Sequence, residues 1–361
     1  MMEAASNPLR HTLRRGRVIE KLKPESRPAY DEFLQGNAQA NYCLDPAWLE
    51  VFQETYGKEG FILLWRDPAS GKVAGAAPGC YLRSPLFGRH LVGMPYLDYG
   101  GPVSADPAVQ SALVQAMKSL AAEHRSELEL RCLDPLGYLN SPPNVKVAMM
   151  LPLPPEGSDA YWKKLDAKVR NQVRKAEKSA VTITWGREEK LDDFYRVFCI
   201  NMRDLGSPVH SKALFASVLR HFPRAQIGNA HREGRCIGGL FRILWNGTLV
   251  IPWASTLKEE RVHSANNALY WESIRFAFEE KCRRVDFGRS SKEEGTYRFK
   301  KQWLAEEAPL YWYQFDAQGA LRGEVRHAAS GKLGLMKNVW SRLPLPIANL
   351  AGPRLRGDIS A

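Results

Sequence analysis

The sequence repeats one order of strands and a helix about 160 residues apart, and this repeat limits the fold more than any other feature. The first copy reads as GKVAGAAPGCYLRS, HLVGMPYLDYGG, the helix DPAVQSALVQAMKSLAAEH and the strand LELRCLD. The second copy reads as GRCIGGLFRILWNG, TLVIPWASTL, the helix SANNALYWESIRFAFEEK and the strand RVDFGRSS. In both copies the second strand contains a proline, Pro95 or Pro252. The repeat predicts two copies of one α/β unit, although two unrelated α/β domains that share a common motif would give a similar pattern.

The length of the chain agrees with two domains. With 361 residues it exceeds the size at which one hydrophobic core usually stops growing, and its hydrophobic content of 44% excludes a mainly disordered chain. We therefore expect an α/β fold with two tandem domains, residues 29–150 and 151–318, each a mixed twisted sheet flanked by helices, with a cleft between them. Residues 1–28 read as a flexible basic arm and residues 319–361 as a basic C-terminal tail.

The net charge and the cysteine and histidine content limit the kinds of partner, metal and compartment that suit this chain. A net charge of +12 indicates an anionic partner, such as a nucleic acid, a phosphorylated substrate or a membrane face. The six cysteines form no C-x-x-C pair and the histidines show no metal-binding spacing, so we expect no metal and a reducing cytosol. No segment approaches the roughly 18 apolar residues of a membrane span. The sequence predicts a cytoplasmic protein, with the inner membrane face as a second place where it could act.

The stretch VDFGRSSKEEGTYRFKKQW, residues 285–303, sets polar and cationic residues directly beyond a predicted buried strand. Its D-F-G triplet is not that of a protein kinase, because the chain has no glycine-rich loop, V-A-I-K strand or H-R-D loop. The chain also lacks a P-loop, a strand-flanked G-x-G-x-x-G and a G-x-S-x-G motif. The stretch is therefore a candidate site of another kind.

A strongly basic helix is predicted at AYWKKLDAKVRNQVRKAEKSA, residues 160–180. Its apolar residues fall at helical spacing, while seven cations stand against two acids. The candidate ligands for a phosphate-bearing substrate are Arg170, Asn171, Arg174 and Lys175. A solvated amphipathic helix explains the same pattern.

The tandem unit resembles the GNAT acyltransferase fold. In that fold a basic, glycine-rich turn between strand and helix holds the pyrophosphate of acetyl-CoA. The equivalent turn here, within TLKEERVHSANNALYW, contains no glycine. The sequence evidence for a CoA-binding turn is therefore weak.

Three segments carry a closer resemblance. The runs KVRNQVRKAEKS, SANNALYWESIRFAFEEKCRRVDFGRSSKEEGTYRFKKQW and PLYWYQF are similar to the FemAB family, specifically to members associated with bacterial exosortase/PEP-CTERM systems that make extracellular polymers. RSPLFGRHLVGMPYLDYGG and LPLPIANLAGP extend this resemblance to roughly residues 18–353.

The resemblance implies transfer of an amino acid from aminoacyl-tRNA to an amine on a cell-wall precursor. It also places the Phe-Lys of a Gly-x-x-x-Phe-Lys segment, here Phe299 and Lys300, at the reaction centre. Residues 181–230 show no long heptad pattern, so the coiled-coil arm of the tRNA-using members is missing. The acyl donor is therefore either an aminoacyl-tRNA or an acyl-CoA, and no cofactor is assigned.

Within this chemistry a fixed ammonium such as Lys300 could stabilise the tetrahedral oxyanion, and Asp286 could orient the incoming amine or accept its proton. Arg289 and Ser290 could bind a phosphate or carboxylate of a substrate. Alternatively, Asp286 and Arg289 form an ion pair that pins the loop, and Lys300 lies on a solvated face.

In the first domain the equivalent strand end is YLDYGG. Asp98 and Tyr99 there could bind the acceptor at the cleft between the domains, or Gly100 and Gly101 could simply make a tight turn.

These observations predict an acyltransferase that is FemAB-like and uses an anionic or phosphorylated donor, tRNA among the candidates. Its acceptor would be an amine on a polymer or cell-envelope precursor. A non-catalytic protein that binds an anionic polymer or RNA, and an acetyl-CoA-dependent N-acetyltransferase, are the alternatives.

Overall fold

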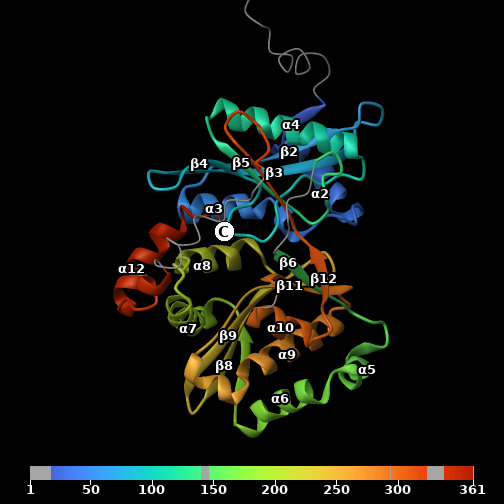
Figure 1. The fold of residues 1–361 in the computed structure, drawn as a ribbon. Coiled ribbons are helices and arrows are strands. Elements are labelled where there is room, and N and C mark those ends of the chain that lie inside the picture. Colours follow the sequence, from blue (N-terminus) through green and yellow to red (C-terminus); the bar gives the residue numbers. More distant parts are fainter. Residues whose placement is uncertain (1–17, 140–145, 293, 323–336, 361) are drawn as a thin grey trace, which may run out of the picture.

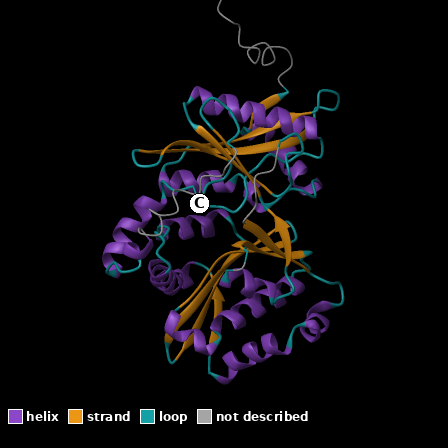
Figure 2. Ribbon diagram, in the orientation of Figure 1, coloured by secondary structure: helices purple, strands orange, loops and turns teal. Residues whose placement is uncertain are grey.

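The computed structural model describes residues 18–139, 146–292, 294–322 and 337–360. It contains two mixed sheets, one above the other in Figure 1, each flanked by helices (Figure 2). In spatial order the first sheet consists of β1 (Ile19–Lys21), β2 (Gly60–Arg66), β3 (Val73–Ser84), β4 (Gly88–Val92), β5 (Glu127–Cys132) and β13 (Tyr311–Phe315). The helices that accompany it are η1 (Pro24–Ser26), α2 (Arg27–Gly36), η2 (Tyr42–Leu44), α3 (Ala47–Tyr56) and α4 (Pro107–Glu123).

The second sheet has seven strands. In spatial order they are β12 (Glu306–Pro309), β6 (Lys146–Pro152), β11 (Arg284–Ser291), β10 (Thr248–Thr256), β9 (Arg235–Trp245), β8 (Ala225–Arg232) and β7 (Thr182–Gly186). The helices in this part of the chain are α5 (Gly157–Lys164), α6 (Ala167–Lys178), η3 (Glu188–Lys190), α7 (Leu191–Asp204), α8 (Lys212–His221), η4 (Lys258–His263), α9 (Ala265–Glu279), α10 (Gly295–Lys301) and α12 (Leu345–Arg356).

The predicted tandem unit is confirmed by the strand order. β3, β4, α4 and β5 in the first sheet correspond to β9, β10, α9 and β11 in the second. In both sheets the first two of these strands pair antiparallel, and the second and third pair parallel. Pro252 lies within β10, whereas Pro95 lies three residues beyond the end of β4. The shared proline is therefore not a feature of both strands.

The two sheets exchange a strand. β6 follows the first domain in the chain, but it pairs with β11 and β12 of the second sheet. The place beside β5 is filled instead by β13, which returns from the C-terminal part of the chain. β12 and β13 are separated only by the buried Leu310, so one short segment serves both sheets. The predicted domain boundary at residues 150 and 151 falls inside β6.

The fold begins earlier and ends later than the predicted domains. Residues 1–17 of the predicted arm and 323–336 of the predicted tail lie outside the described residues. Ile19–Lys21 of the arm pair antiparallel with β2, and α2 begins at Arg27. In the tail, α12 packs against α7. Within the described ranges no helix combines the length and the apolar character that crossing a membrane requires.

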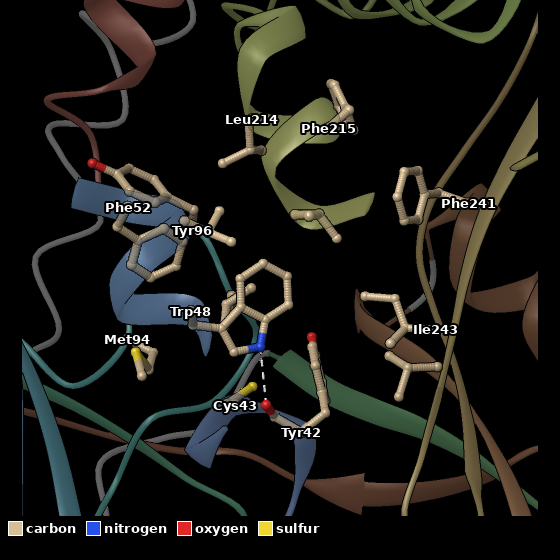
Figure 3. Packing of buried hydrophobic residues seen from close by; sticks show 14 of the residues in the cluster. Tyr42, Cys43, Trp48, Phe52, Met94, Tyr96, Leu214, Phe215, Phe241 and Ile243 are labelled. Carbon is tan, nitrogen blue, oxygen red and sulfur yellow. Dashed lines mark hydrogen bonds between the residues drawn. The ribbon is translucent and has the colours of Figure 1, made fainter. Parts of the chain in front are cut away.

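A large apolar cluster contains residues of both domains (Figure 3). Trp48 of α3 is fully buried at its centre and donates a hydrogen bond from Nε1 to the Tyr42 carbonyl, 2.9 Å away. Its ring centroid lies 4.7 Å from Phe222 and 6.5 Å from Trp253, both in the second half of the chain. The labelled members in Figure 3 are Tyr42, Cys43, Trp48, Phe52, Met94, Tyr96, Leu214, Phe215, Phe241 and Ile243.

Because Trp48 contacts both domains, we expect Trp48→Ala to lower the free energy of unfolding by about 3–5 kcal/mol, the usual cost of removing a buried Trp side chain. Chemical denaturation measures this change. The control is Trp65→Ala, since Trp65 is only half-buried and packs within the first domain. Equal losses for the two variants would contradict a central role for Trp48.

Candidate active site

β10 and β11 separate in the middle of the second sheet. Their parallel pairing covers three residue pairs and ends at Val250 opposite Asp286. The pairing of β11 with β6 shifts register between Asp286 and Arg289, and Gly288 within this bulge has a φ of 71°. Such a φ favours glycine, which explains the residue at this position. The bulge turns the chain so that the polar residues predicted as a site meet the first domain.

Asp286 is buried at this point. The Tyr99 hydroxyl lies 2.7 and 2.8 Å from the two carboxylate oxygens and donates its hydrogen to them. The Gly288 backbone N–H donates to Oδ1 over 2.7 Å. Burial raises the pKa of the Asp286 carboxyl to about 6, although these hydrogen bonds act in the opposite direction. A residue of each domain thus contributes to one buried carboxyl site.

Lys300 lies on the short helix α10, near enough for its charge to act on the Asp286 carboxyl. Its side chain is only 9% exposed, so it does not lie on a solvated face. Nζ donates to the Arg289 carbonyl over 2.9 Å and to the Gly288 carbonyl over 3.3 Å. Burial lowers the pKa of Lys300 to about 8, while the charges of Asp98 and Asp286 oppose this change.

The neighbours of Lys300 on α10 differ from it. Phe299 is half-buried, and its ring packs edge-on against Tyr270 with 4.9 Å between the centroids. Lys301 is exposed, and its Nζ lies 3.5 Å from a carboxylate oxygen of Glu307. Lys300 is therefore the one cation of α10 that the helix directs into the protein.

The ion pair of this loop joins Arg289 to Asp98, not to Asp286 as considered from the sequence. Arg289 Nε lies 3.2 Å from Asp98 Oδ1, and the Arg289 backbone N–H donates to Oδ2 over 3.0 Å. The guanidinium also lies 5.5 Å from the centre of the Trp312 ring. Within the described residues, Arg289 Nη1 and Ser290 Oγ are buried without a hydrogen-bond partner. Buried polar atoms of this kind are available to a ligand.

Asp98 and Tyr99 reach the site on a segment that follows β4. Gly100 N–H donates to the Arg131 carbonyl, so the segment stays beside the strand β5. Gly100 and Gly101 do not have positive φ and make no tight turn of the predicted kind. Instead they allow close packing, because a Cβ on Gly101 would lie 2.2 Å from the Cys132 sulfur. These glycines therefore fix where Asp98 and Tyr99 enter the domain interface.

Arg131 and Trp312, which lie at the edge of the site, were not predicted as site residues. Arg131 is buried in β5, and its guanidinium lies 4.9 Å from the centre of the Trp312 ring, which Arg289 also approaches. Arg131 Nη2 donates to the Ser360 carbonyl over 3.0 Å, and Tyr96 N–H donates to the same carbonyl over 2.9 Å. The available signal was an arginine in the strand LELRC, where Glu129 pairs with it. The end of the described chain thus lies between the domains, as the label C shows in Figure 1.

The predicted basic helix lies elsewhere, at the end of the second domain farthest from the first (Figure 1). It is two helices, α5 and α6, because Leu165 after α5 is extended and Asp166 caps α6 by accepting a hydrogen bond from Lys168 N–H. Arg170 Nη1 donates to the Lys163 carbonyl over 2.9 Å, and the Arg174 guanidinium lies 5.8 Å from the Trp162 ring centre. Asn171, Arg174 and Lys175 are exposed. None of the α6 cations forms an ion pair within the described residues.

The turn that corresponds to the CoA-binding turn of the GNAT fold lies beside α6. It consists of η4 and Ser264, which precedes α9 with a φ of 59°. The Ser264 hydroxyl donates to the Gln172 side chain of α6. α6 therefore contacts the N-terminus of α9, although it is remote from Lys300.

Two cavities and one group of side chains that could bind a metal were also found among the described residues. A cavity of about 20 Å³ is lined by Tyr99 and Arg131 among others, whereas one of about 400 Å³ lies near Leu49, Phe61 and Tyr81 of the first domain. Within the described residues, the ligand atoms of one group, Asp193, His231 and Cys236, lie within 4.8 Å of one another. The strands of this group, β8 and β9, lie on the far side of β10 from β11. This group is not part of the candidate active site.

Comparison with known proteins gives the class of this enzyme. Residues 163–301 match the acetyltransferase (GNAT) domain. The fold is similar to the crystal structure of FemX, with a TM-score of 0.63 and 13% identity over 83% of this chain and 98% of that one. No curated protein sequence matches the chain.

Two other solved structures share the fold. L-PGS from Bacillus licheniformis has a TM-score of 0.51 and 12% identity over 90% of this chain and 99% of that one. A tandem GNAT protein from the clavulanic acid biosynthesis pathway has a TM-score of 0.51 and 12% identity, with 83% and 98% covered. Residues 163–301 thus match a GNAT acetyltransferase domain, the fold is similar to those of FemX and the tandem GNAT protein, and together these comparisons support an acyltransferase.

We expect Gly288→Ala to destabilise the protein more than Gly247→Ala. Both glycines have a φ near 70°, so both variants incur the strain of a left-handed alanine, roughly 1–2 kcal/mol. Only at Gly288 would the new Cβ lie 2.5 Å from Asp98 Oδ2; at Gly247 the nearest atom is 3.4 Å away. Denaturant unfolding of both variants isolates the contact with Asp98. Equal free energies of unfolding would show that Asp98 moves away without cost.

Proposed function

We propose that the protein transfers an acyl or aminoacyl group to an amine of a cell-envelope or extracellular polymer precursor, as a FemAB-like enzyme. The observation that carries this proposal is the buried Lys300 ammonium, which two backbone carbonyls hold where β10 and β11 separate. An ammonium has three N–H groups, and the two hydrogen bonds to Gly288 and Arg289 leave the third for a substrate oxygen. The tandem GNAT fold supports the same reaction class.

In the proposed reaction the acceptor amine attacks the acyl carbonyl carbon, and a C–N bond forms as the carbonyl oxygen becomes an oxyanion. Lys300 stabilises this oxyanion, and Asp286 takes up the proton that the amine loses. The C–O bond of an aminoacyl ester or the C–S bond of a thioester then breaks, and the leaving group receives a proton. A carboxyl pKa of about 6 suits Asp286 to this role because the group is mostly ionised at neutral pH.

The donor is either an aminoacyl-tRNA or an acyl-CoA. β10 connects Val250 at the strand separation to Thr256 before η4, six residues or roughly 20 Å along the strand. A donor that places its acyl carbon at Lys300 and its phosphates at the turn beside α6 must span this length, as both donors can. We assign Arg170, Asn171, Arg174 and Lys175 of α6 to its phosphates. Their charge and lack of ion pairs within the described residues support this assignment.

The acceptor enters from the domain interface in this proposal. Asp98 and Tyr99 come from the first domain, and the buried Arg289 Nη1 and Ser290 Oγ, which have no partner within the described residues, would bind a phosphate or carboxylate of a substrate. We also propose the PEP-CTERM association and a cytoplasmic location at the inner membrane face, which the sequence resemblance suggests.

We expect Lys300→Met to slow single-turnover transfer by on the order of 10²–10³-fold, the usual cost of losing one oxyanion donor. Purified protein is incubated with an amine acceptor and either aminoacyl-tRNA or acetyl-CoA, and product is followed by mass spectrometry. The control is Lys301→Met, which removes an exposed cation next to it in the chain. A parental rate for Lys300→Met, or an equal loss for Lys301→Met, would refute the oxyanion role. If neither donor class reacts with the parent protein, binding of an anionic polymer becomes the better proposal.

We expect kcat/KM to rise with pH through about 6 and to fall through about 8. Asp286 accepts a proton only when it is ionised, and Lys300 stabilises an oxyanion best when it is charged. Asp286→Asn should therefore remove the rising limb and lower the rate by roughly 10²-fold. Lys300→Arg should move the falling limb to higher pH, because a guanidinium stays charged. If both limbs of the pH profile of kcat/KM remain in these variants, the groups that titrate are on the substrates instead.

A further inference from the structure

The outward side of α12 carries two largely exposed apolar side chains. Ile347 is 53% exposed and Leu350 is 70% exposed, and they lie on one side of the helix at a spacing of three residues. Val339 and Leu205, which are also more than half exposed, lie on segments next to this helix. These four residues, Leu205, Val339, Ile347 and Leu350, form what we call the α12 face. Figure 1 shows α12 at the outside of the molecule, beside α7.

The orientation of α12 is fixed by its other side. Ala348 and Gly352 are buried, and a Cβ on Gly352 would lie 3.0 Å from Val209. Beyond the helix, the Gly357 carbonyl accepts a hydrogen bond of 2.6 Å from the Tyr96 hydroxyl. Arg356 is held by His210, whose Nε2 lies 3.1 Å from Arg356 Nε. The helix therefore cannot turn Ile347 and Leu350 inward, and their exposure is a stable property of the fold.

The charges around the α12 face have one sign. Lys337, Arg342 and Arg354 are exposed, and the sequence from residue 337 to 357 contains no Asp or Glu. Two acids on segments that adjoin this face are already paired: Asp204 lies 2.7 Å from Arg203, and Asp358 lies 3.0 Å from Lys58. A partner of this face must therefore combine apolar groups with negative charge.

We propose that the α12 face docks on an anionic lipid surface, with Ile347 and Leu350 among the acyl chains and the cations at the headgroups. A projecting helix with apolar side chains on its outer face and cations near both ends has the pattern of interfacial helices. The partly buried Trp340 just before α12 is a residue type typical of this zone. This inference is independent of acyl transfer, because lipid docking requires no donor or acceptor.

Sedimentation with vesicles tests the proposal. The full chain should bind vesicles of equal parts phosphatidylglycerol and phosphatidylcholine, bind pure phosphatidylcholine weakly, and lose affinity as salt rises. Ile347→Glu with Leu350→Glu should weaken binding by on the order of tenfold or more, since both apolar contacts are lost. Arg342→Gln with Arg354→Gln should weaken it by roughly 30-fold at low salt.

The matched control is Leu86→Glu with Val262→Glu, which changes two other exposed apolar residues to the same charge. This variant should bind like the parent. All substituted residues are exposed, and thermal unfolding checks that each variant is folded. Failure of the parent to bind anionic vesicles, or equal loss in the control, would overturn the proposal. So would a parent dimer that Ile347→Glu with Leu350→Glu converts to a monomer, because a second copy would then cover the face.

Discussion

The exchange of β6 and β13 makes the two domains one structural unit. β6 leaves the first half of the chain to pair with β11 and β12, and β13 returns to pair with β5. Without β13, β5 would be an exposed edge with unpaired backbone groups, so the first sheet depends on the end of the second domain. The cluster around Trp48 adds apolar contacts across the same boundary. The two domains therefore cannot separate without loss of both a strand ladder and a shared core.

A rigid boundary of this kind is what permits buried charges between the domains. Burial of an ion is costly unless it is paired and hydrogen-bonded. Two of the charged groups obtain a partner from the first half of the chain, Asp286 from Tyr99 and Arg289 from Asp98, whereas Lys300 is held by two carbonyls of its own half. Burial raises the pKa of Asp286 to about 6 and lowers that of Lys300 to about 8, so both groups are mostly ionised near pH 7. The fold thus places a proton acceptor and a cation side by side at neutral pH.

The features of the fold that could be predicted from the sequence are those that local residue patterns determine. Strand and helix order follow from hydrophobic periodicity, so the repeated unit was correct. The prediction that the polar residues follow the strand was wrong for Asp286, Arg289 and Ser290, because β11 runs from Arg284 to Ser291 and contains them. The strand exchange could not be predicted, because KVAMMLP and YWYQF are both short apolar segments and only long-range packing selects their sheets. The partner of Arg289 was missed for a similar reason, since the bulge at Gly288 turns Arg289 toward Asp98. GTYRFKK is too short for its period to distinguish a helix from an extended chain.

The C-terminal segment connects the α12 face to the candidate active site. From α12 the chain passes Gly357, held by the Tyr96 hydroxyl, to Ser360, whose carbonyl accepts from Arg131. Arg131 approaches the Trp312 ring, and so does Arg289, the partner of Asp98. These contacts form a continuous series from a surface helix to the residues around Lys300, the kind of series through which packed elements can transmit a displacement. α12 is thus linked through packed and hydrogen-bonded residues to the ion pair of Arg289 and Asp98.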